Sequence, residues 1–370
     1  MSGSIMNVFR QDAFSTVALT QQILKRPYMP SGLGALRLFD EVPIRNKAAQ
    51  IEQAQGKLTV IKTSKRGDPD VERDKGQDKR QARYFECPRL FQADTIRADE
   101  IQDVRAFMEP GSGLPVVTEL MQLQKEAARR LSGPTGLQAN LEFTRERMRL
   151  GAIRGEVVDA DNTVLYNWFE EFGITQPQQE VFNLAADVTG TLRPLVNQIQ
   201  RTIVRKSQGA FTTSSRVMAL CGDDFWDAFI NHPDVKTTYL NWTAAADLRN
   251  GSEFAAFGEF TFGGITFFNY RGSDDASTIA VPTNGVFFFP ENAPGIFQEI
   301  LAPAEFWPWV NQEGKKEYVI PIHDRDRNAW FRQEMYAYPL FICTRPEVLL
   351  SGTMDATADL TPVKNATEQV

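Results

Sequence analysis

The sequence predicts a mixed α+β fold that is divided into more than one lobe. The chain has 370 residues, which is more than a single hydrophobic core usually holds. Stretches with helical spacing of apolar residues alternate irregularly with short β-branched and aromatic stretches, and no internal repeat is visible. Because strands and helices follow one another without a fixed period, α+β fits better than a doubly wound parallel sheet.

Residues 1–45 are expected to form a loosely folded N-terminal arm. A short helix is predicted from Asp12, which can cap it, to Lys25. Four prolines and glycines between Pro27 and Gly34 then break regular structure. A segment with so little core of its own must lie on another surface to be ordered.

Residues 46–90 are predicted to form a long projecting hairpin. Leu58–Ile61 is a strand signal rich in β-branched residues, and Tyr84–Cys87 resumes a strand-like pattern. Between them, from Lys62 to Arg83, 13 of 22 residues are charged and the two signs are interleaved. An isolated hairpin is only marginally stable in water, so this one is either a solvated loop or a segment that docks on a neighbouring copy of the chain.

Residues 91–155 are predicted to be helical and to contain one long, interrupted helix. A short helix is expected at Ala98–Val104, and the pair Gly133-Pro134 interrupts the long one. Its apolar stripe is formed by Leu120, Leu123, Ala127, Leu131, Leu137, Leu141, Met148 and Ile153. Arg145, Arg147 and Arg149 are expected on the polar side of this stripe.

A second lobe is expected to begin near residue 187, after a hairpin over residues 155–168 that turns at Asp159–Asn162. Asp223 and Asp224 are expected to cap one of its helices. Helices are predicted at 191–205 and 225–230. A hairpin is expected over 260–270, with its turn at Gly263-Gly264. Further strands are expected at 217–220, 279–282, 285–290, 317–322 and 337–344.

Composition limits the possible functions. The formal net charge of −7 argues against a protein whose main surface grips nucleic acid, although it allows a wall that only encloses it. The three cysteines, Cys87, Cys221 and Cys343, are far apart in sequence and are expected to be buried free thiols. Neither a secretory signal nor an apolar run of about 18 residues is visible, so we expect a soluble protein made in a cytoplasm.

Catalytic and metal-binding motifs are weak throughout the chain. His232 stands before a proline at an expected helix start, and His323 precedes Asp324 and Asp326 in a group that could bind a metal but is more typical of a salt-bridged turn. A phosphate-binding loop, a nucleophile elbow and a dinucleotide fingerprint are all missing from the sequence. We therefore expect no enzyme, no cofactor and no metal; a hydrolase that uses the His323 group is the minor alternative.

A series of segments in a fixed order carries a likeness to a known family: Arg147–Tyr166, Asn167–Gly173, Gly222–Tyr239, Phe262–Ile265 with Tyr270–Gly272, Phe289-Pro290, Ala302–Ala304, Gln333-Glu334 and Pro339–Pro346. Together they resemble the lambda-type major capsid protein family of tailed bacteriophages, often called the phage major capsid protein E family. Each piece alone is a loop or a helix cap, and their order and spacing carry the likeness across roughly residues 10–350.

The resemblance implies the Hong Kong 97-type capsid fold, with a domain plan that follows the elements above. The implied parts are an N-terminal arm (1–45), an extended E-loop hairpin (46–90), a peripheral domain with a long spine helix (91–170 and 334–352), an axial domain (171–333) and a C-terminal tail (353–370). The function it implies is a structural one: hexamers and pentamers assemble into an icosahedral virion shell around double-stranded DNA. The implied partners are other copies of the chain and the portal, scaffold and decoration proteins of the same virus, with synthesis in the host cytoplasm.

The charged hairpin tip is the predicted contact between copies. The residues expected to pair across copies are Lys65, Arg66, Asp68, Asp70, Glu72, Arg73, Asp74, Lys79 and Arg80. Each exposed pair contributes only about 0–1 kcal/mol, but the pairs together define direction and register. The alternative reading is another oligomeric virion component, such as a decoration or tail-tube protein.

Overall fold

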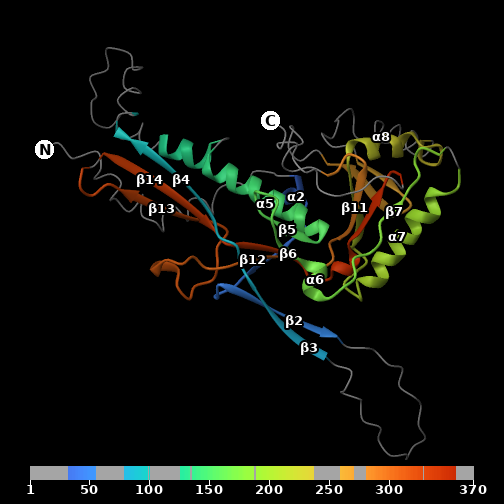
Figure 1. Cartoon of the computed structure of the whole chain (residues 1–370), viewed down its shortest axis with the longest axis horizontal. Helices are drawn as coiled ribbons and strands as arrows, with labels where there is room; N and C mark the ends of the chain where they lie inside the picture. The colour runs from blue at the N-terminus through green and yellow to red at the C-terminus, as the bar shows by residue number, and fades with distance from the viewer. Residues whose placement is uncertain are drawn as a thin grey trace, which may run out of the picture.

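The protein is elongated, and a two-stranded hairpin projects from its body (Figure 1). The structure is a computed structural model that describes residues 32–55, 79–98, 100, 126–133, 136–186, 189–236, 259–270, 281–327 and 329–355. Helices and strands are mixed in these ranges, so the α+β prediction is confirmed. No helix in them is long and apolar enough to cross a membrane.

The first lobe is a three-stranded antiparallel sheet with a long helix beside it. The strand order is β13 (Tyr318–His323), β14 (Trp330–Ala337), β4 (Leu90–Arg97), and the helix is α5 (Leu137–Arg154). The small core of this lobe contains Ile96, Leu131, Leu137, Leu141, Val319, Phe331 and Met335. We call it the three-stranded lobe.

Helix α5 is the spine of the molecule, because its two ends belong to different cores. Leu137 and Leu141 pack in the three-stranded lobe, whereas Leu150 and Ile153 pack in the main core of the protein. The helix ends at Gly155, which has a φ of 87° and lies so close to Phe169 that an added Cβ would be 2.3 Å from the ring. The predicted stripe is confirmed for its described members, and so is the interruption after residue 132.

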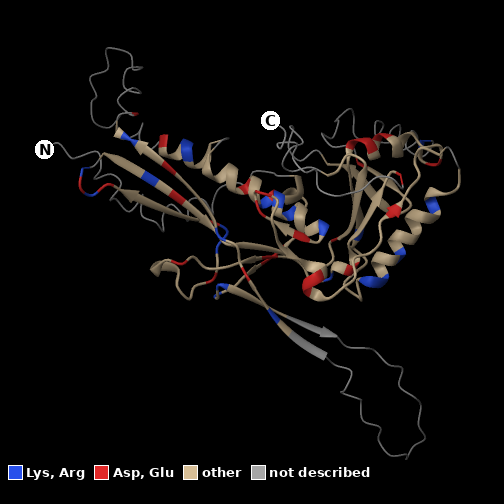
Figure 2. Ribbon diagram, in the orientation of Figure 1, with Lys and Arg blue, Asp and Glu red and all other residues tan. Residues whose placement is uncertain are grey.

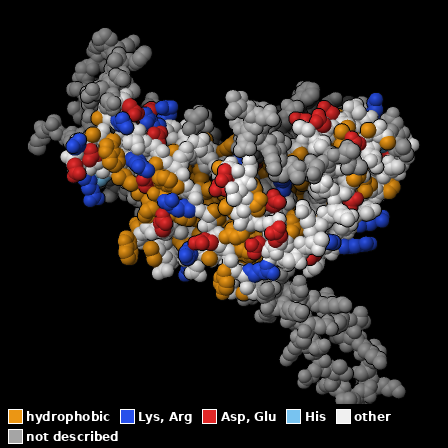
Figure 3. Space-filling model, viewed as in Figure 1, with side chains coloured by type: hydrophobic (Ala, Val, Ile, Leu, Met, Phe, Trp, Pro, Cys, Tyr) orange, Lys and Arg blue, Asp and Glu red, His pale blue; other side chains and the backbone are white. Residues whose placement is uncertain are grey.

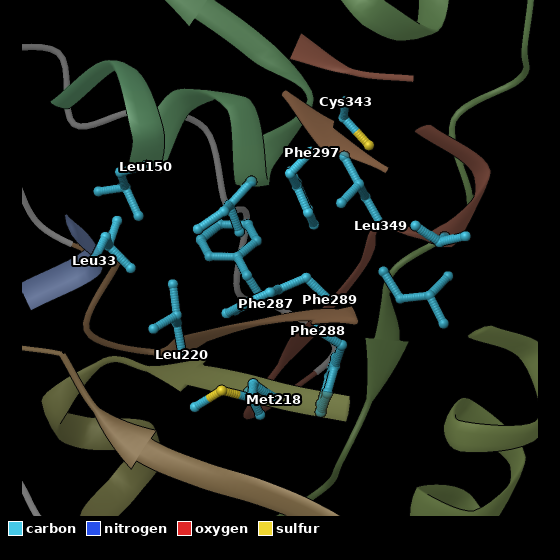
Figure 4. Packing of buried hydrophobic residues seen from close by; sticks show 14 of the residues in the cluster. Leu33, Leu150, Met218, Leu220, Phe287, Phe288, Phe289, Phe297, Cys343 and Leu349 are labelled. Carbon is cyan, nitrogen blue, oxygen red and sulfur yellow. The ribbon is translucent and has the colours of Figure 1, made fainter. Parts of the chain in front are cut away.

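The second lobe is a six-stranded mixed sheet, which we call the six-stranded lobe. Its strand order is β7 (Glu180–Val181), β16 (Leu350–Thr353), β11 (Gly285–Glu291), β8 (Arg216–Cys221), β10 (Ile265–Asn269), β9 (Glu259–Phe262). Helices α7 (Leu192–Lys206) and α8 (Asp223–Asn231) flank it. The central strands are buried along their length because both sheet faces are covered, and Figure 4 shows the packing around Phe287, Phe288 and Phe289 of β11.

A third small sheet joins the two lobes. It consists of β1 (Asp40–Pro43), β12 (Phe297–Leu301) and β15 (Pro339–Cys343), and Phe39 packs edge-on against rings from β12 and β15. The remaining described elements are α2 (Gly32–Ala35), the hairpin β5 (Glu156–Val158) and β6 (Val164–Asn167), α6 (Trp168–Phe172) and the 3-10 helices η4 (Trp307–Trp309) and η5 (Pro346–Val348).

The projecting hairpin pairs β2 (Ala48–Gln55) with β3 (Lys79–Glu86) in antiparallel register. The prediction of a hairpin is confirmed, but its strands were wrongly placed. Residues 48–55 were not predicted as a strand, and Lys79–Arg83, assigned to the tip, belong to β3. Both strands are polar and nearly free of β-branched residues, so their pairing leaves little signal in composition.

Two further predictions from sequence are wrong. Residues 91–97 were expected to be helical, but they form β4, which pairs along its whole length with β14. Asp223 and Asp224 do not cap α8: they lie in its first turn, Gly222 is the N-cap, and the Asp223 carboxylate instead accepts a hydrogen bond from Asn269. The strand expected at 337–344 is confirmed as β15, although residue 337 itself ends β14.

The other expected helices and hairpins lie where the sequence predicts them. Those confirmed are the hairpin at 155–168, helices α7 and α8, the hairpin β9–β10 that turns at Gly263-Gly264, and strands β8, β11 and β13. The parts of the chain that lie outside the described residues are the arm up to residue 31, the strand signal at 58–61, most of the helix expected at 98–104, Leu120 and Leu123, and residues 279–280 of the strand expected at 279–282. Residues 281–282 are described and are not in a strand.

Candidate assembly interface

The charged residues predicted to pair across copies fall mainly outside the described part of the chain. Lys65, Arg66, Asp68, Asp70, Glu72, Arg73 and Asp74 are in the undescribed segment 56–78. The backbone of Lys79 and Arg80 lies at the start of β3, at the far end of the hairpin. Pairing across copies therefore stays a prediction, and the two last residues belong to a strand instead of a tip.

The hairpin is fixed to the body at one end, which we call the hairpin root: Ala49, Phe85, Tyr166, Trp168 and Phe172. Phe85 on β3 is 3% exposed and packs edge-on against Trp168, with ring centroids 5.3 Å apart. The Tyr166 hydroxyl accepts from the backbone N–H of Glu86 (3.1 Å) and donates to its carbonyl (3.0 Å). These contacts set the direction in which the hairpin leaves the body.

Beyond the root, the hairpin has an exposed face of its own. Tyr84, the neighbour of buried Phe85, is 69% exposed, as expected where successive strand residues point to opposite faces. A two-stranded hairpin has no second layer on which to bury such side chains. Its exposed face is available to another molecule.

A second exposed site is an apolar surface on the three-stranded lobe. We define it by Phe91, Phe306, Trp307 and Val310. The Phe91 and Phe306 rings both contact buried Tyr336, each at a centroid distance of 4.9 Å, so one ring links these two members of the surface. The Trp307 side chain is 92% exposed. Figure 3 shows hydrophobic side chains gathered on this part of the molecule.

Trp307 is exposed although the turn that carries it is firmly anchored. Trp309, two residues further on, is 2% exposed and packs against Tyr318 with ring centroids 5.0 Å apart. Beside the surface, Arg89 pairs with Glu305 and its guanidinium lies over the Phe91 and Tyr336 rings. A large apolar side chain held in water by a rigid turn is typical of a docking site.

Inside the molecule, a buried ion cluster holds α5 to its surroundings. It comprises Glu142, Arg145, Glu146, Arg149, Glu299 and Glu317. Arg145 is 2% exposed and forms a salt bridge with Glu299 on β12, with Glu142 and Glu317 each 3.9 Å away. Arg149 pairs with Glu142 (2.6 Å) and with Glu146 (3.2 Å). The prediction that Arg145 and Arg149 face the polar side is therefore wrong.

Glu146 joins three segments that are far apart in sequence. Its carboxylate accepts the backbone N–H groups of Leu33 (2.5 Å) and Gly34 (3.2 Å), which belong to α2. The Tyr270 hydroxyl, just after β10, donates to it at 2.9 Å. Burial, together with the neighbouring Glu146 charge, raises the pKa of Tyr270, so this phenol remains a donor. One carboxylate thus connects α5, the first described helix and the six-stranded lobe.

Charge is distributed unevenly over the six-stranded lobe. Helix α7 carries Arg193, Arg201, Arg205 and Lys206, all exposed, and no acidic residue. Helix α8 carries three exposed aspartates and no basic residue. In Figure 2 the basic residues follow the lower right flank of the lobe and the acidic ones its top. A net charge of −7 for the chain therefore conceals a local basic face.

Of the residues considered for chemistry, Asp324 and His232 have structural roles, and His323 is the last residue of β13. Asp324 accepts the backbone N–H groups of Asp326, Arg327 and Ala329, bonds that tie the turn and lower its pKa. The Nδ1 atom of buried His232 accepts the N–H of Asp234 at the start of the next helical turn. No group of three potential metal ligands occurs among the described side chains.

The three cysteines are buried free thiols, as predicted. Burial raises the pKa of Cys87 and of Cys343 to about 12, and it raises that of Cys221 as well. The neutral thiol is therefore the form present at any ordinary pH. A buried, protonated thiol is a weak nucleophile, so these residues act as small apolar side chains.

Sequence inspection missed the apolar surface and the buried ion cluster. The cluster left one signal, since Glu142, Arg145, Glu146 and Arg149 are three and four residues apart and so share a helix face. Its other members, Glu299 and Glu317, come from segments more than 150 residues away, and no local pattern points to them. The exposure of Trp307 depends on the fold of the loop and had no signal at all.

Comparison with known proteins adds a direct finding. The family described as phage major capsid protein E matches residues 15–354. A major capsid protein of Salmonella phage Felix O1 is 22% identical over 373 residues, which cover 93% of this chain and 97% of that protein. A major capsid protein of Pseudomonas phage KPP10 is 24% identical over 332 residues, which cover 85% and 90%.

Two solved phage capsid structures contain chains that are similar to this one. The capsid of cyanophage A-1(L) matches with a TM-score of 0.47 and 9% identity, covering 90% of this chain and 94% of that one. The mature capsid of bacteriophage PhiM1 matches with a TM-score of 0.46 and 10% identity, covering 90% of each chain.

Proposed function

This chain belongs to the phage major capsid protein E family, and we propose that its hairpin and its apolar surface are the contacts through which copies join. Members of that family are structural proteins, so this chain is a subunit of an icosahedral virion shell and has no enzymatic role. Between the shell subunit and the decoration or tail-tube alternatives, the family match decides for the shell.

The observation that supports the hairpin contact is its shape. Strands β2 and β3 pair over eight residues each, and the contacts with the body that are described lie at the root and at the adjoining Ile51 and Arg83. From there the hairpin projects away from the body (Figure 1). A free two-stranded ribbon is marginally stable, and another surface is needed to stabilise it. In a shell of identical subunits, that surface is a neighbouring copy.

The apolar surface is the second proposed contact. Copies in a permanent assembly bury apolar area that would otherwise remain in water, and such interfaces commonly exceed about 2,000 Å². Trp307 offers a large side chain that loses little conformational freedom on docking, because its turn is already ordered. Charged pairs at the hairpin tip would then add register to an association driven by apolar contact.

The finer assignments are proposals of the same kind. We assign the arm to 1–45, the E-loop to 46–90, the peripheral domain to 91–170 with 334–352, the axial domain to 171–333 and the tail to 353–370. The two separate lobes support a division into two main domains, but two of its bounds need adjustment. Strands β13 and β14 pair with β4 in the three-stranded sheet, which favours a peripheral domain that includes 318–337. Strand β16 pairs in the six-stranded sheet, which favours an axial domain that includes 350–353.

The shell is proposed to be built from hexamers and pentamers and to enclose double-stranded DNA. Portal, scaffold and decoration proteins are its proposed partners, and the host cytoplasm is the proposed place of synthesis. The test is to express the chain alone and with the products of neighbouring genes, and to image the material by negative-stain electron microscopy. Closed shells or six- and five-membered rings are expected. A uniform monomer or dimer under both conditions would overturn the proposal.

A further inference from the structure

We propose that the basic face of α7 contacts the phosphates of double-stranded DNA, and that this is where the shell wall touches its contents. The basic face consists of Arg193, Arg201, Arg205 and Lys206. The inference rests on the proposed function, because DNA meets this face only if the chain encloses it. It goes beyond that function by assigning particular side chains to the contact.

The geometry of α7 separates its charges from its core side. Leu192, Val196, Ile199 and Ile203 are buried and form an inner stripe at helical spacing. Arg201 and Arg205, one turn apart, lie on the opposite side and are exposed. Asn197, Gln198 and Thr202 lie between the cations and add hydrogen-bonding groups without any negative charge.

These cations are not paired with carboxylates in the described part of the protein. None of the four side chains forms an ion pair in those ranges, whereas exposed Arg216 of the same lobe pairs with Glu291 at 3.4 Å. The Arg193 guanidinium lies over the Phe262 ring, 5.8 Å from the centroid. This cation–π contact holds the side chain beside the helix and leaves its positive charge without a carboxylate partner.

The length of the face suits a duplex. From Arg193 to Arg205 the helix rises about 18 Å, a distance over which duplex DNA presents about ten phosphate charges. Arg201 and Arg205 lie opposite the buried stripe, and helical spacing puts Arg193 on one side of them and Lys206 on the other. Four cations spread in this way form a weak site with no means of reading base edges. Weak, sequence-independent contact suits a wall along which DNA must move during filling.

The opposite charge on α8 gives the lobe a polarity. Asp223, Asp224 and Asp227 are exposed on that helix, away from the basic face (Figure 2). Duplex DNA is attracted to the α7 side and repelled from the α8 side. An acidic protein could exploit the same attraction, but the exposed side of α7 is mainly cations and amides, with one exposed valine, Val204, and no exposed aromatic ring. Such a surface favours a phosphate backbone over a folded partner.

The test measures binding of a short mixed-sequence DNA duplex to full-length protein held below its assembly concentration, with sedimentation confirming that it is unassembled. Wild-type affinity is expected to fall with salt at a slope of about −3 in log–log form. The double variant Arg201→Gln/Arg205→Gln should make this slope shallower by about 2. Arg201→Lys/Arg205→Lys keeps the charge and should keep the slope, which separates lost contacts from misfolding.

The matched control is Arg216→Gln/Lys236→Gln, which removes the same charge from exposed positions of the same lobe outside α7. It should leave the slope unchanged. Equal binding by wild type and the α7 double variant, or an equal loss in the control, would overturn the inference. The inference would also be overturned if the wild-type protein bound an acidic protein but did not bind the duplex. Electron microscopy of the same preparations at high concentration tests whether the protein forms shells. A failure of the proposed shell function is therefore distinguished from a failure of the proposed DNA contact.

Discussion

The guanidinium of Arg145 on α5 forms a salt bridge with the carboxylate of Glu299 on β12, and both side chains are at least 95% buried. A buried charge destabilises the folded state unless a partner of opposite charge is present beside it. We expect Arg145→Ala to lower the free energy of unfolding by about 3–5 kcal/mol, because Glu299 would remain buried without a counter-charge. Urea unfolding of the unassembled subunit measures this.

Arg147→Ala is the matched control for Arg145→Ala. This side chain is on the same helix, but it bonds at the surface with the Ala160 carbonyl and Asn162. A loss of about 1 kcal/mol or less is expected. Equal losses for the two variants would show that burial of the ion pair has no special importance.

Glu146→Ala should release α2 from the body. The variant leaves the buried N–H of Leu33 without its acceptor and also removes the acceptor for Gly34 and Tyr270. We expect a loss of about 3 kcal/mol and faster hydrogen exchange at the Leu33 amide. Tyr270→Phe removes one of the three bonds and should cost about 1 kcal/mol without exposing α2. Unchanged exchange in Glu146→Ala would contradict the role given to this carboxylate.

Trp307→Ala should impair assembly while leaving the subunit stable. The side chain contributes almost nothing to the subunit core, so the thermal midpoint should be unchanged. Loss of a central docking residue is expected to cost about 2 kcal/mol per contact and to raise the assembly concentration at least tenfold. Light scattering during assembly measures it.

Trp309→Ala provides the contrast to Trp307→Ala. Trp309 is buried against Tyr318, so its truncation should cost about 3–5 kcal/mol of subunit stability. If Trp307→Ala assembled as readily as the wild type, the apolar surface would not be an interface between copies.

Alkaline pH should weaken the fold through the buried thiols. The pKa of Cys87 and of Cys343 is about 12 in the folded chain, compared with about 8.5 when unfolded. Between these values the folded state holds more protons than the unfolded state, so stability falls as pH rises from about 9, by up to about 1.4 kcal/mol per pH unit for each thiol. Unfolding midpoints from pH 8 to 11 measure the slope, which Cys343→Ala should reduce.

A thiol reagent gives an independent check. At pH 8 the folded protein should react far more slowly than the protein unfolded in guanidinium, where all three cysteines are accessible. Rapid labelling of the folded protein would indicate that at least one thiol is not protected as described.

The local pattern of the sequence predicted those elements that are specified by one apolar stripe or by the residues of one turn. The stripe of α5 and the Gly263-Gly264 turn are examples, because their side chains specify the backbone directly. Strand β4 was assigned to a helix because its identity depends on β14, which follows more than 230 residues later. The hairpin strands were misplaced because most of their residues are polar, and the buried pair Ala49 and Phe85 marks the register only at the root.

The candidate sites show the same dependence on distant segments. Charged residues were assumed to be solvated, which is correct for Arg147 but not for Arg145, whose acidic neighbours arrive from β12 and the segment before β13. The basic face of α7 was concealed by the chain's acidic total, because a net charge sums over surfaces that point in different directions. Sequence composition describes a surface only on average.

Because the hairpin is attached to the body at its root, a small rotation there moves its far end by a much larger distance. Eight strand residues extend about 26 Å from a base held by a few aromatic rings. A tilt of about 5° at Phe85 would displace the end of the strands by roughly 2 Å, enough to lose a hydrogen bond. The range of angles that these rings allow between the hairpin and the body therefore limits how far the distance between neighbouring subunits can vary. It also limits the range of shell curvature that subunits of this sequence can form.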